Sequence, residues 1–193
     1  MLPEIAKTRG LDAPSKRITA EDLYAMPDHG RRNELVEGKL WPMSPANVEH
    51  GRITYRVGFL IGQYVFQNGL GDMYAAETGF ILERDPDTVR APDVAFISRA
   101  RLQAVEKQKS GYGEIIPDLV VEVVSPHDTA SEIQMKVRDY LHAGVRLIWV
   151  VDPQTEMVSE YAHSGRMQLL NPQDELNGGD VLPGFTLPVA DIF

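Results

Sequence analysis

The amino-acid sequence predicts an α/β protein built on a mixed β-sheet that is flanked by helices. Apolar residues recur at helical spacing between Asn47 and Asn68, which predicts one long helix. Residues 117–124 and 145–151 are apolar segments of strand length, and the segment between them has helical periodicity. Such a strand–helix–strand unit normally forms a right-handed parallel crossover. We therefore expect a sheet that contains at least one parallel pair.

The helices have recognisable ends. Residues Thr19–Asp22 have the pattern of a capping box, which predicts a short helix that ends before Pro27. The helix between the two apolar strands can begin at Asp128 or Thr129, and Gly144 terminates it near the second strand. Local capping signals thus place both helices before any tertiary contact is considered.

The other strands are predicted from short apolar segments bounded by turn residues. A closing tail, residues 178–193, is punctuated by Gly and Pro, and we expect it to pack over the sheet as an extended arm. The predicted strands are a hairpin at 34–43 that turns at Gly38, single strands at 73–82 and 90–98, and a second hairpin at 157–162 and 167–170.

We expect residues 1–18 to form an N-terminal arm and residues 19–193 to form one domain, because no repeat, low-complexity tract or linker interrupts the chain. The N-terminus lacks the apolar core of a signal peptide. No stretch approaches the roughly 20 apolar residues of a membrane helix. The sequence has no cysteine, which excludes disulfides, thiolate metal sites and cysteine nucleophiles. These features predict a cytoplasmic protein with no membrane partner.

Composition is ordinary for a globular protein, but the charge balance is acidic. The net charge of −9 disfavours strong non-specific binding to DNA, because domains that bind DNA in this way are usually basic. A bound cation would offset part of the acidic excess. Basic residues gather early in the chain, at Arg31, Arg32, Lys39, Arg52 and Arg56.

Three carboxylates interrupt predicted apolar strands: Glu34, Asp93 and Glu122. A buried carboxylate is costly unless a cation or a basic side chain pairs with it. Asp93 shares its strand face with the small residues Ala91 and Ala95, which leaves room beside it. If Asp93 and Glu122 lie on one face of paired strands, they could together hold one Mg²⁺, which needs only one or two protein carboxylates. The alternative is a structural salt bridge to a basic residue, with Arg90 or Lys136 as the partner.

Lys136 follows Glu122 by 14 residues, at the edge of the apolar stripe of the crossover helix. From this position its ammonium group can reach over the sheet toward Glu122. A lysine beside a metal site can orient an attacking water or offset charge that develops on a phosphate. The alternative is a surface lysine that only packs its aliphatic stem against the protein.

Other conspicuous side chains have simpler interpretations. His50 begins the long helix, where a satisfied polar residue is favoured over a substrate contact. Asp118 at a strand start is expected to be structural, and Tyr140 is expected to lie in the core with its hydroxyl near the site. Trp41 and Trp149 are expected to serve packing. The sequence contains no phosphate-binding glycine loop and no Gly-x-Ser-x-Gly elbow.

These motifs resemble a known family. Asp93 in APDVAFI and Glu122 in PDLVVEVVSP resemble the core of the PD-(D/E)XK nucleases. The chain is similar, over residues 18–193, to the restriction-endonuclease-like family called Uma-two, long a domain of unknown function in bacteria, notably cyanobacteria. The similarity is carried by NELVEGKLWPMSP, His50, PDLVVEVVSPHDT, Lys136, DYLHAGVRLIWVVDP and LPGFTLPVADIF.

The resemblance implies a restriction-endonuclease-like fold with Asp93 and Glu122 as metal ligands. It implies Lys136 as the catalytic base or electrostatic stabiliser, and Glu34 as an additional acid. The superfamily pattern has a lysine two residues after Glu122, where this sequence has Val124, so Lys136 is the substitute.

The implied reaction is hydrolysis of DNA phosphodiester bonds with Mg²⁺, or with Mn²⁺ as an alternative cation. RNA or a small nucleotide is an alternative substrate. Another alternative is an inactive nuclease fold that binds nucleic acid or protein. Because cutting both strands of a duplex generally needs two active sites, a homodimer is expected.

Overall fold

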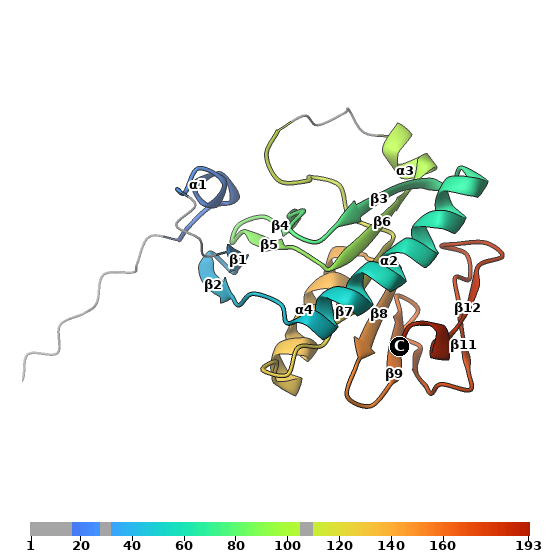
Figure 1. The fold of residues 1–193 in the computed structure, drawn as a ribbon. Helices are drawn as coiled ribbons and strands as arrows, with labels where there is room; N and C mark the ends of the chain where they lie inside the picture. The colour runs from blue at the N-terminus through green and yellow to red at the C-terminus, as the bar shows by residue number, and fades with distance from the viewer. Residues whose placement is uncertain (1–16, 28–31, 105–109) are drawn as a thin grey trace, which may run out of the picture.

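The described residues form two main β-sheets, of six and four strands, that lie side by side, with helices packed against the larger one (Figure 1). A separate sheet of two strands lies in the C-terminal part. The computed structural model describes residues 17–27, 32–104 and 110–193, so residues 1–16 of the predicted arm and Arg31 lie outside the described residues. The helices are α1 (Ala20–Tyr24), α2 (Val48–Asn68), α3 (Arg99–Gln103), α4 (Ala130–Ala143) and the 3-10 helix η1 (Val189–Asp191). The strands are β1 (Arg32–Val36), β2 (Lys39–Met43), β3 (Gly71–Ala75), β4 (Phe80–Glu83), β5 (Thr88–Arg90), β6 (Val94–Ser98), β7 (Leu119–Val123), β8 (Leu147–Asp152), β9 (Met157–Ala162), β10 (Met167–Leu170), β11 (Glu175–Asn177) and β12 (Thr186–Pro188).

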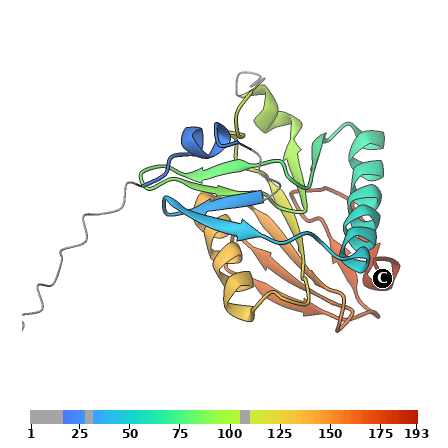
Figure 2. The same cartoon turned by 60° about the vertical axis from the view of Figure 1, so that its left-hand side comes forward.

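The larger sheet is mixed, with the strand order β10-β9-β8-β7-β6-β3. Strands β7 and β8 pair in parallel through the α4 crossover, and the other pairs are antiparallel. Alternate residues of β7 face opposite sides: Val121 packs in the core under α2, and Val120 packs in the core under α4. Figure 2 shows the two helices on opposite faces of this sheet. The predicted mixed sheet flanked by helices is therefore confirmed.

The smaller sheet has the order β2-β1-β5-β4, and it corrects two strand predictions. Residues 73–82 and 90–98 were each predicted as one strand, but each segment divides between the two sheets. The first turns at Glu77, which adopts a left-handed φ of 78°. The second breaks at Pro92, which has no N–H to donate to a strand ladder. These two segments therefore carry the chain from the larger sheet to the smaller one and back.

The predicted helix ends are confirmed. The capping box at Thr19 is present, α2 is capped by Asn47, and Gly69 closes α2 in the left-handed conformation. Of the two residues that could begin α4, Thr129 is the N-cap, and it forms a second capping box. Asp128 instead accepts a hydrogen bond from the backbone N–H of Ser125.

The C-terminal tail packs its apolar residues into the same core as α2. Leu182, Phe185 and Ile192 are buried there, and the Phe185 ring stacks on Trp149 with centroids 6.0 Å apart. The tail thus packs over the sheet as predicted, although it also contains β12, which pairs antiparallel with the preceding strand β11, and the 3-10 helix η1. Among the described helices, none combines the length and the apolar character that crossing a membrane requires.

A buried ion cluster joins the smaller sheet to α4. Arg90 on β5 donates a 2.6 Å hydrogen bond to Glu34 on β1 and another of 2.6 Å to Asp139 on α4. Arg90 and Glu34 are both almost fully buried. Arg90 was considered as a partner for Asp93 or Glu122, but the structure pairs it with Glu34 and Asp139 instead. The cluster therefore fixes how the smaller sheet sits over α4.

We expect Arg90→Met to destabilise the protein by about 3–5 kcal/mol, because Glu34 would remain buried without its cation. Urea unfolding followed by circular dichroism measures this loss. Arg32→Met is the matched control: its ion pair with Glu77 is solvent-exposed, so less than about 1 kcal/mol should be lost. Equal losses in the two variants would contradict a special role for the buried cluster.

Candidate active site

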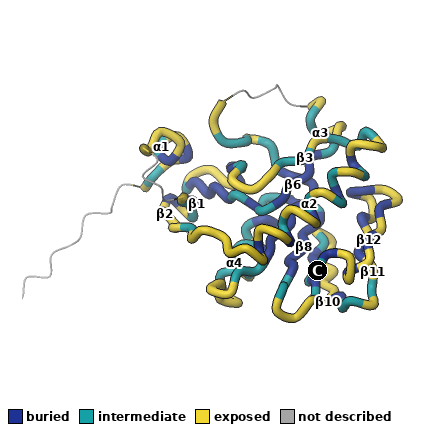
Figure 3. Tube along the Cα trace, in the orientation of Figure 1, coloured by how far each residue is buried: buried dark blue, intermediate teal, exposed yellow. Residues whose placement is uncertain are grey.

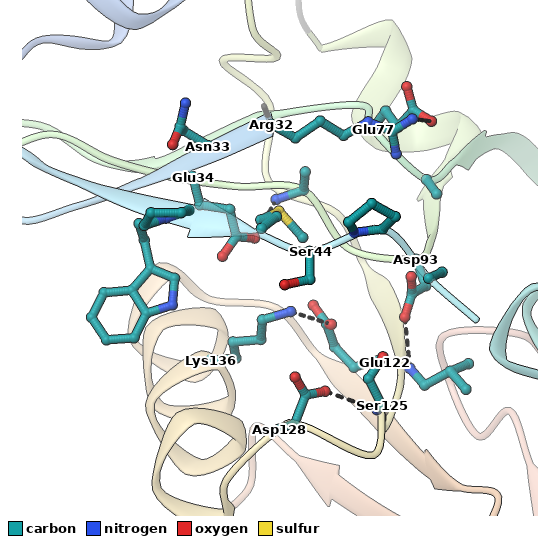
Figure 4. A pocket seen from close by; sticks show the side chains of 18 of the residues that line it. Arg32, Asn33, Glu34, Ser44, Glu77, Asp93, Glu122, Ser125, Asp128 and Lys136 are labelled. Atoms are coloured by element: carbon teal, nitrogen blue, oxygen red, sulfur yellow. Dashed lines mark hydrogen bonds and ion pairs between the residues drawn. The ribbon is translucent and has the colours of Figure 1, made fainter. Parts of the chain in front are cut away.

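One pocket of about 800 Å³ collects the four residues that were predicted to form the site. It lies between the smaller sheet, the first turns of α2, the adjoining ends of β6 and β7, and the first turns of α4. Figure 4 shows the carboxylates of Glu34, Asp93 and Glu122 around this space, with the Lys136 ammonium group bonded to Glu122. The pocket is lined by Glu34, Asp93, Glu122 and Lys136, together with His50.

The pairing of β6 with β7 sets Asp93 beside Glu122. Val94 pairs with Val121 in an antiparallel register, so Asp93, one residue before β6, lies level with Glu122. Asp93 Oδ2 accepts a 2.7 Å hydrogen bond from the backbone N–H of Val123, which fixes its carboxylate at the end of β7. Asp93 thus precedes the strand in which it was expected, but it lies level with Glu122 on the neighbouring strand.

Two side chains of α4 hold the Glu122 carboxylate. Lys136 Nζ donates to Glu122 Oε2 at 2.7 Å, and the Tyr140 hydroxyl donates to Oε1 at 2.5 Å. Their spacing of four residues places both groups on one face of the helix. The salt bridge considered for Glu122 is therefore present, with Lys136 as the partner. Lys136 is not a surface lysine, because only 23% of its side chain is exposed.

The surroundings of Glu122 perturb its ionisation. Burial raises the pKa of Glu122 to about 7, the opposing charge of Lys136 limits the rise, and the charges of Asp93 and Glu34 add to it. Burial also acts to lower the pKa of Lys136, but the charges of Glu122 and Glu34 outweigh it and hold that pKa above its ordinary value. Lys136 is consequently a cation at neutral pH, and Glu122 can exchange a proton near neutrality.

His50 touches one of the predicted metal ligands. Its Nε2 lies 3.3 Å from Asp93 Oδ2, and its Nδ1 lies 3.3 Å from Thr54 Oγ1. The hydrogen bond to Asp93 raises the pKa of His50 above its ordinary value, although burial opposes the rise. His50 is thus a satisfied polar residue, as expected, yet it also lines the pocket. Nothing in the local sequence indicates the contact with Asp93, which depends on how α2 meets the sheet.

Glu34 lies in the pocket wall with both carboxylate oxygens engaged. Its Oε1 accepts from the backbone N–H of Ala91 at 2.9 Å, and its Oε2 accepts from Arg90. Asp139, which completes this cluster, was not singled out from the sequence. The sequence feature that could have indicated Asp139 is its position three residues after Lys136, which places it on a neighbouring part of the same helix face.

Two of the remaining predictions from the sequence agree with the structure, and one does not. Asp118 accepts from the backbone N–H of Ser98 and pairs with Arg101, which agrees with a structural role. Trp149 is fully buried, as expected. Trp41 differs from its packing prediction, because it is 38% exposed and lines the pocket.

The donor set fits a hard divalent cation. In the part of the chain that the structure describes, no three His, Asp or Glu side chains converge as a ready metal cage. Asp93 and Glu122 nevertheless supply two carboxylates at one pocket wall, and Mg²⁺ takes one or two such ligands and completes its shell with water. Each carboxylate offers about four lone-pair sites, so the hydrogen bonds already present leave sites for a metal.

The raised pKa of Glu122 has a consequence for stability. Between its ordinary value of 4.5 and about 7, the folded state binds more protons at this group than the unfolded state. The contribution of Glu122 to stability should therefore be present at low pH and be lost as the pH rises through this window.

We expect the metal-free protein to lose more unfolding free energy between pH 5 and pH 8 than the Glu122→Gln variant loses. Urea unfolding in EDTA at both pH values gives the comparison, and the difference between the two proteins isolates Glu122 from other titrating groups. Glu175→Gln, at an exposed carboxylate on β11, should behave as the unmodified protein. Identical pH profiles for the unmodified protein and Glu122→Gln would show that Glu122 titrates normally.

Comparison with known proteins agrees with this architecture. A family model, Uma2, described as "Putative restriction endonuclease", matches residues 20–190. A crystal structure described as "a putative nuclease belonging to DUF820" from Anabaena variabilis is similar, with a TM-score of 0.78 and 19% sequence identity, over 91% of this chain and 97% of that chain. No curated protein matches the chain. The structural likeness shows a shared fold, and because the family model spans most of the sequence, the chain belongs to the Uma2 family of restriction-endonuclease-like proteins.

Proposed function

We propose that this protein is a metal-dependent endonuclease that hydrolyses phosphodiester bonds of DNA in the pocket described above. The observation that carries the proposal is the convergence of Asp93, Glu122 and the Lys136 ammonium group at one wall of the pocket. Membership of a restriction-endonuclease-like family supports the same reaction class.

Asp93 and Glu122 are the residues that would hold the cation, with Mg²⁺ expected and Mn²⁺ as a substitute. When bound, the cation supplies Lewis-acid polarisation of the scissile phosphate and lowers the pKa of water at the site. Before the cation arrives, Lys136 and Tyr140 hold the Glu122 carboxylate in place, and the Val123 amide holds Asp93. The two ligands are therefore oriented in advance, which reduces the reorganisation that binding requires.

Lys136 is better suited to electrostatic stabilisation than to proton abstraction. Its pKa is raised by Glu122, so it keeps its proton at neutral pH. A fixed ammonium group beside the reacting phosphate offsets the negative charge that develops in the transition state. The sequence allowed Lys136 to be either a catalytic base or an electrostatic stabiliser, and its contact with Glu122 favours the electrostatic role.

The other pocket residues support this centre. His50 orients Asp93 through the contact between Nε2 and Oδ2. Glu34, which the family resemblance implied as an additional acid, acts through Arg90 and the Ala91 amide to position the smaller sheet. Trp41 presents an exposed ring at the pocket, and an aromatic ring can stack on an unpaired base.

We expect Asp93→Asn, Glu122→Gln and Lys136→Met each to reduce DNA cleavage by roughly 10²–10³-fold, because each removes a preorganised charge from the reacting centre. The measurement is cleavage of supercoiled plasmid and of linear single-stranded DNA with Mg²⁺, with Mn²⁺ and with EDTA. A parallel RNA substrate tests the choice of nucleic acid.

Lys39→Met and Glu175→Gln are the matched controls, since both residues are exposed on strands and neither lines the pocket. They should retain full activity. Cleavage that survives all three pocket substitutions would place the active site elsewhere. Folded protein without cleavage in any metal would favour an inactive module that binds nucleic acid or protein.

Metal binding can be tested without turnover. We expect the affinity for Mn²⁺, measured by calorimetry or electron paramagnetic resonance, to rise roughly tenfold between pH 6 and pH 8, because a proton competes with the cation at Glu122. Asp93→Asn should abolish specific binding, and Glu122→Gln should weaken it and remove its pH dependence. Binding that is unchanged in both variants would contradict the proposed ligands.

A further inference from the structure

The outer face of α2 carries an apolar stripe. Four large side chains lie on it: Val48 is 90% exposed, Tyr55 74%, Phe59 53% and Phe66 88%. At 100° per residue their spacing places all four within a narrow strip along the helix. The Tyr55 and Phe59 rings stack on each other with centroids 6.2 Å apart. We call these four residues the α2 stripe.

No described segment of the chain covers the α2 stripe. The opposite face of α2 supplies the core residues Ile53, Val57, Ile61 and Val65. Figure 2 shows the helix at the outer side of the molecule, and Figure 3 shows exposed positions along its outward face. Three exposed aromatic residues and one exposed valine that align on a well-packed helix indicate an interaction surface, because scattered single apolar residues would not align in this way.

The α2 stripe is self-complementary. The intervals between its residues are symmetric about Val57, so an antiparallel copy of the helix sets Val48 against the partner's Phe66 and Tyr55 against the partner's Phe59. Each contact then occurs twice, as two-fold symmetry requires, and every apolar residue meets an apolar residue. Gly62 lies level with the partner's Arg52, and the guanidinium of Arg52 donates a 2.7 Å hydrogen bond to the carbonyl of Phe193 in its own chain.

We propose that the α2 stripe is the interface of a symmetric homodimer in which the two α2 helices pack antiparallel. Large aromatic residues bury about 150–250 Å² each when covered. The four stripe residues would therefore contribute on the order of 500 Å² per copy, toward the roughly 800 Å² per partner of a standard interface. The flanking residues Gly51, Arg52 and Gln63 are exposed beside the stripe and supply further area.

The dimer would place one pocket near each end of the helix pair. His50 and Thr54 line the pocket from the first turns of α2. Antiparallel pairing about Val57 separates the two His50 residues by about 20 Å along the helix direction, at 1.5 Å per residue. If the proposed nuclease function holds, one particle would carry the two active sites that cutting both strands requires. The interface itself does not depend on that function.

The first test is the mass in solution. Sedimentation velocity should give twice the 21.5 kDa mass of the chain for the unmodified protein. Phe59→Glu should weaken dimerisation by more than about tenfold, since aromatic anchors dominate interface energies. Leu169→Glu, at an equally exposed apolar residue on β10, is the matched control and should remain dimeric. A monomeric unmodified protein would overturn the proposal.

The second test uses the absence of cysteine, which lets single thiols report geometry. In the antiparallel pair, position 48 lies opposite the partner's position 66, whereas like positions are about 27 Å apart. A mixture of Val48→Cys and Phe66→Cys proteins should therefore form a disulfide-linked dimer on oxidation, and neither variant alone should do so. Both substitutions lie at exposed positions, so folding is preserved.

The outcomes are distinct. A covalent dimer from Val48→Cys alone would indicate parallel helices, and no covalent dimer in the mixture would exclude the antiparallel pair; either result overturns the proposal. A monomer whose Phe59→Glu variant loses DNA retention would assign the α2 stripe to nucleic acid instead. Because neither mass nor cross-linking depends on cleavage, failure of the nuclease proposal would leave these results unchanged.

Discussion

The antiparallel pairing of β6 with β7 is the constraint on which the pocket depends. Its register brings Asp93 level with Glu122, although the two residues lie 29 positions apart along the chain. The α4 crossover then returns over the same face and delivers Lys136 and Tyr140 to the Glu122 carboxylate. A slip of one residue in the register would turn Glu122 toward the apolar core under α2 and would separate the carboxylates.

Buried charge links the pocket to the rest of the fold. Lys136 balances Glu122 on the larger sheet, and Arg90 balances Glu34 and Asp139 between the smaller sheet and α4. Buried ion pairs are weak sources of stability, because desolvation offsets most of the attraction. In this protein the ion pairs orient α4 relative to the two sheets. Lys136 on α4 binds Glu122 on the larger sheet, and Asp139 on α4 binds Arg90 on the smaller sheet. Hydrogen bonds and ion pairs thus hold the pocket wall at the residues of the proposed site.

The candidate site was largely visible in the sequence, and its supporting residues were not. Carboxylates inside apolar strands single out Asp93 and Glu122, because burial makes an unpaired charge costly wherever it occurs. The same signal cannot distinguish a metal ligand from a buried ion pair, and Glu34 proves to be held by Arg90. The contact of His50 with Asp93 depends on the packing of α2 on the sheet, which no local pattern encodes.

The sequence by itself determined α1, α2, α4 and the parallel crossover, because capping residues and apolar periodicity act within a few residues of one another. It did not determine that residues 73–82 and 90–98 each divide between two sheets, since the partner of a strand is chosen by distant segments. It also showed the buried face of α2 but not that Tyr55, Phe59 and Phe66 remain uncovered. Only the tertiary structure decides which apolar surface is exposed, because burial is a property of the assembled chain.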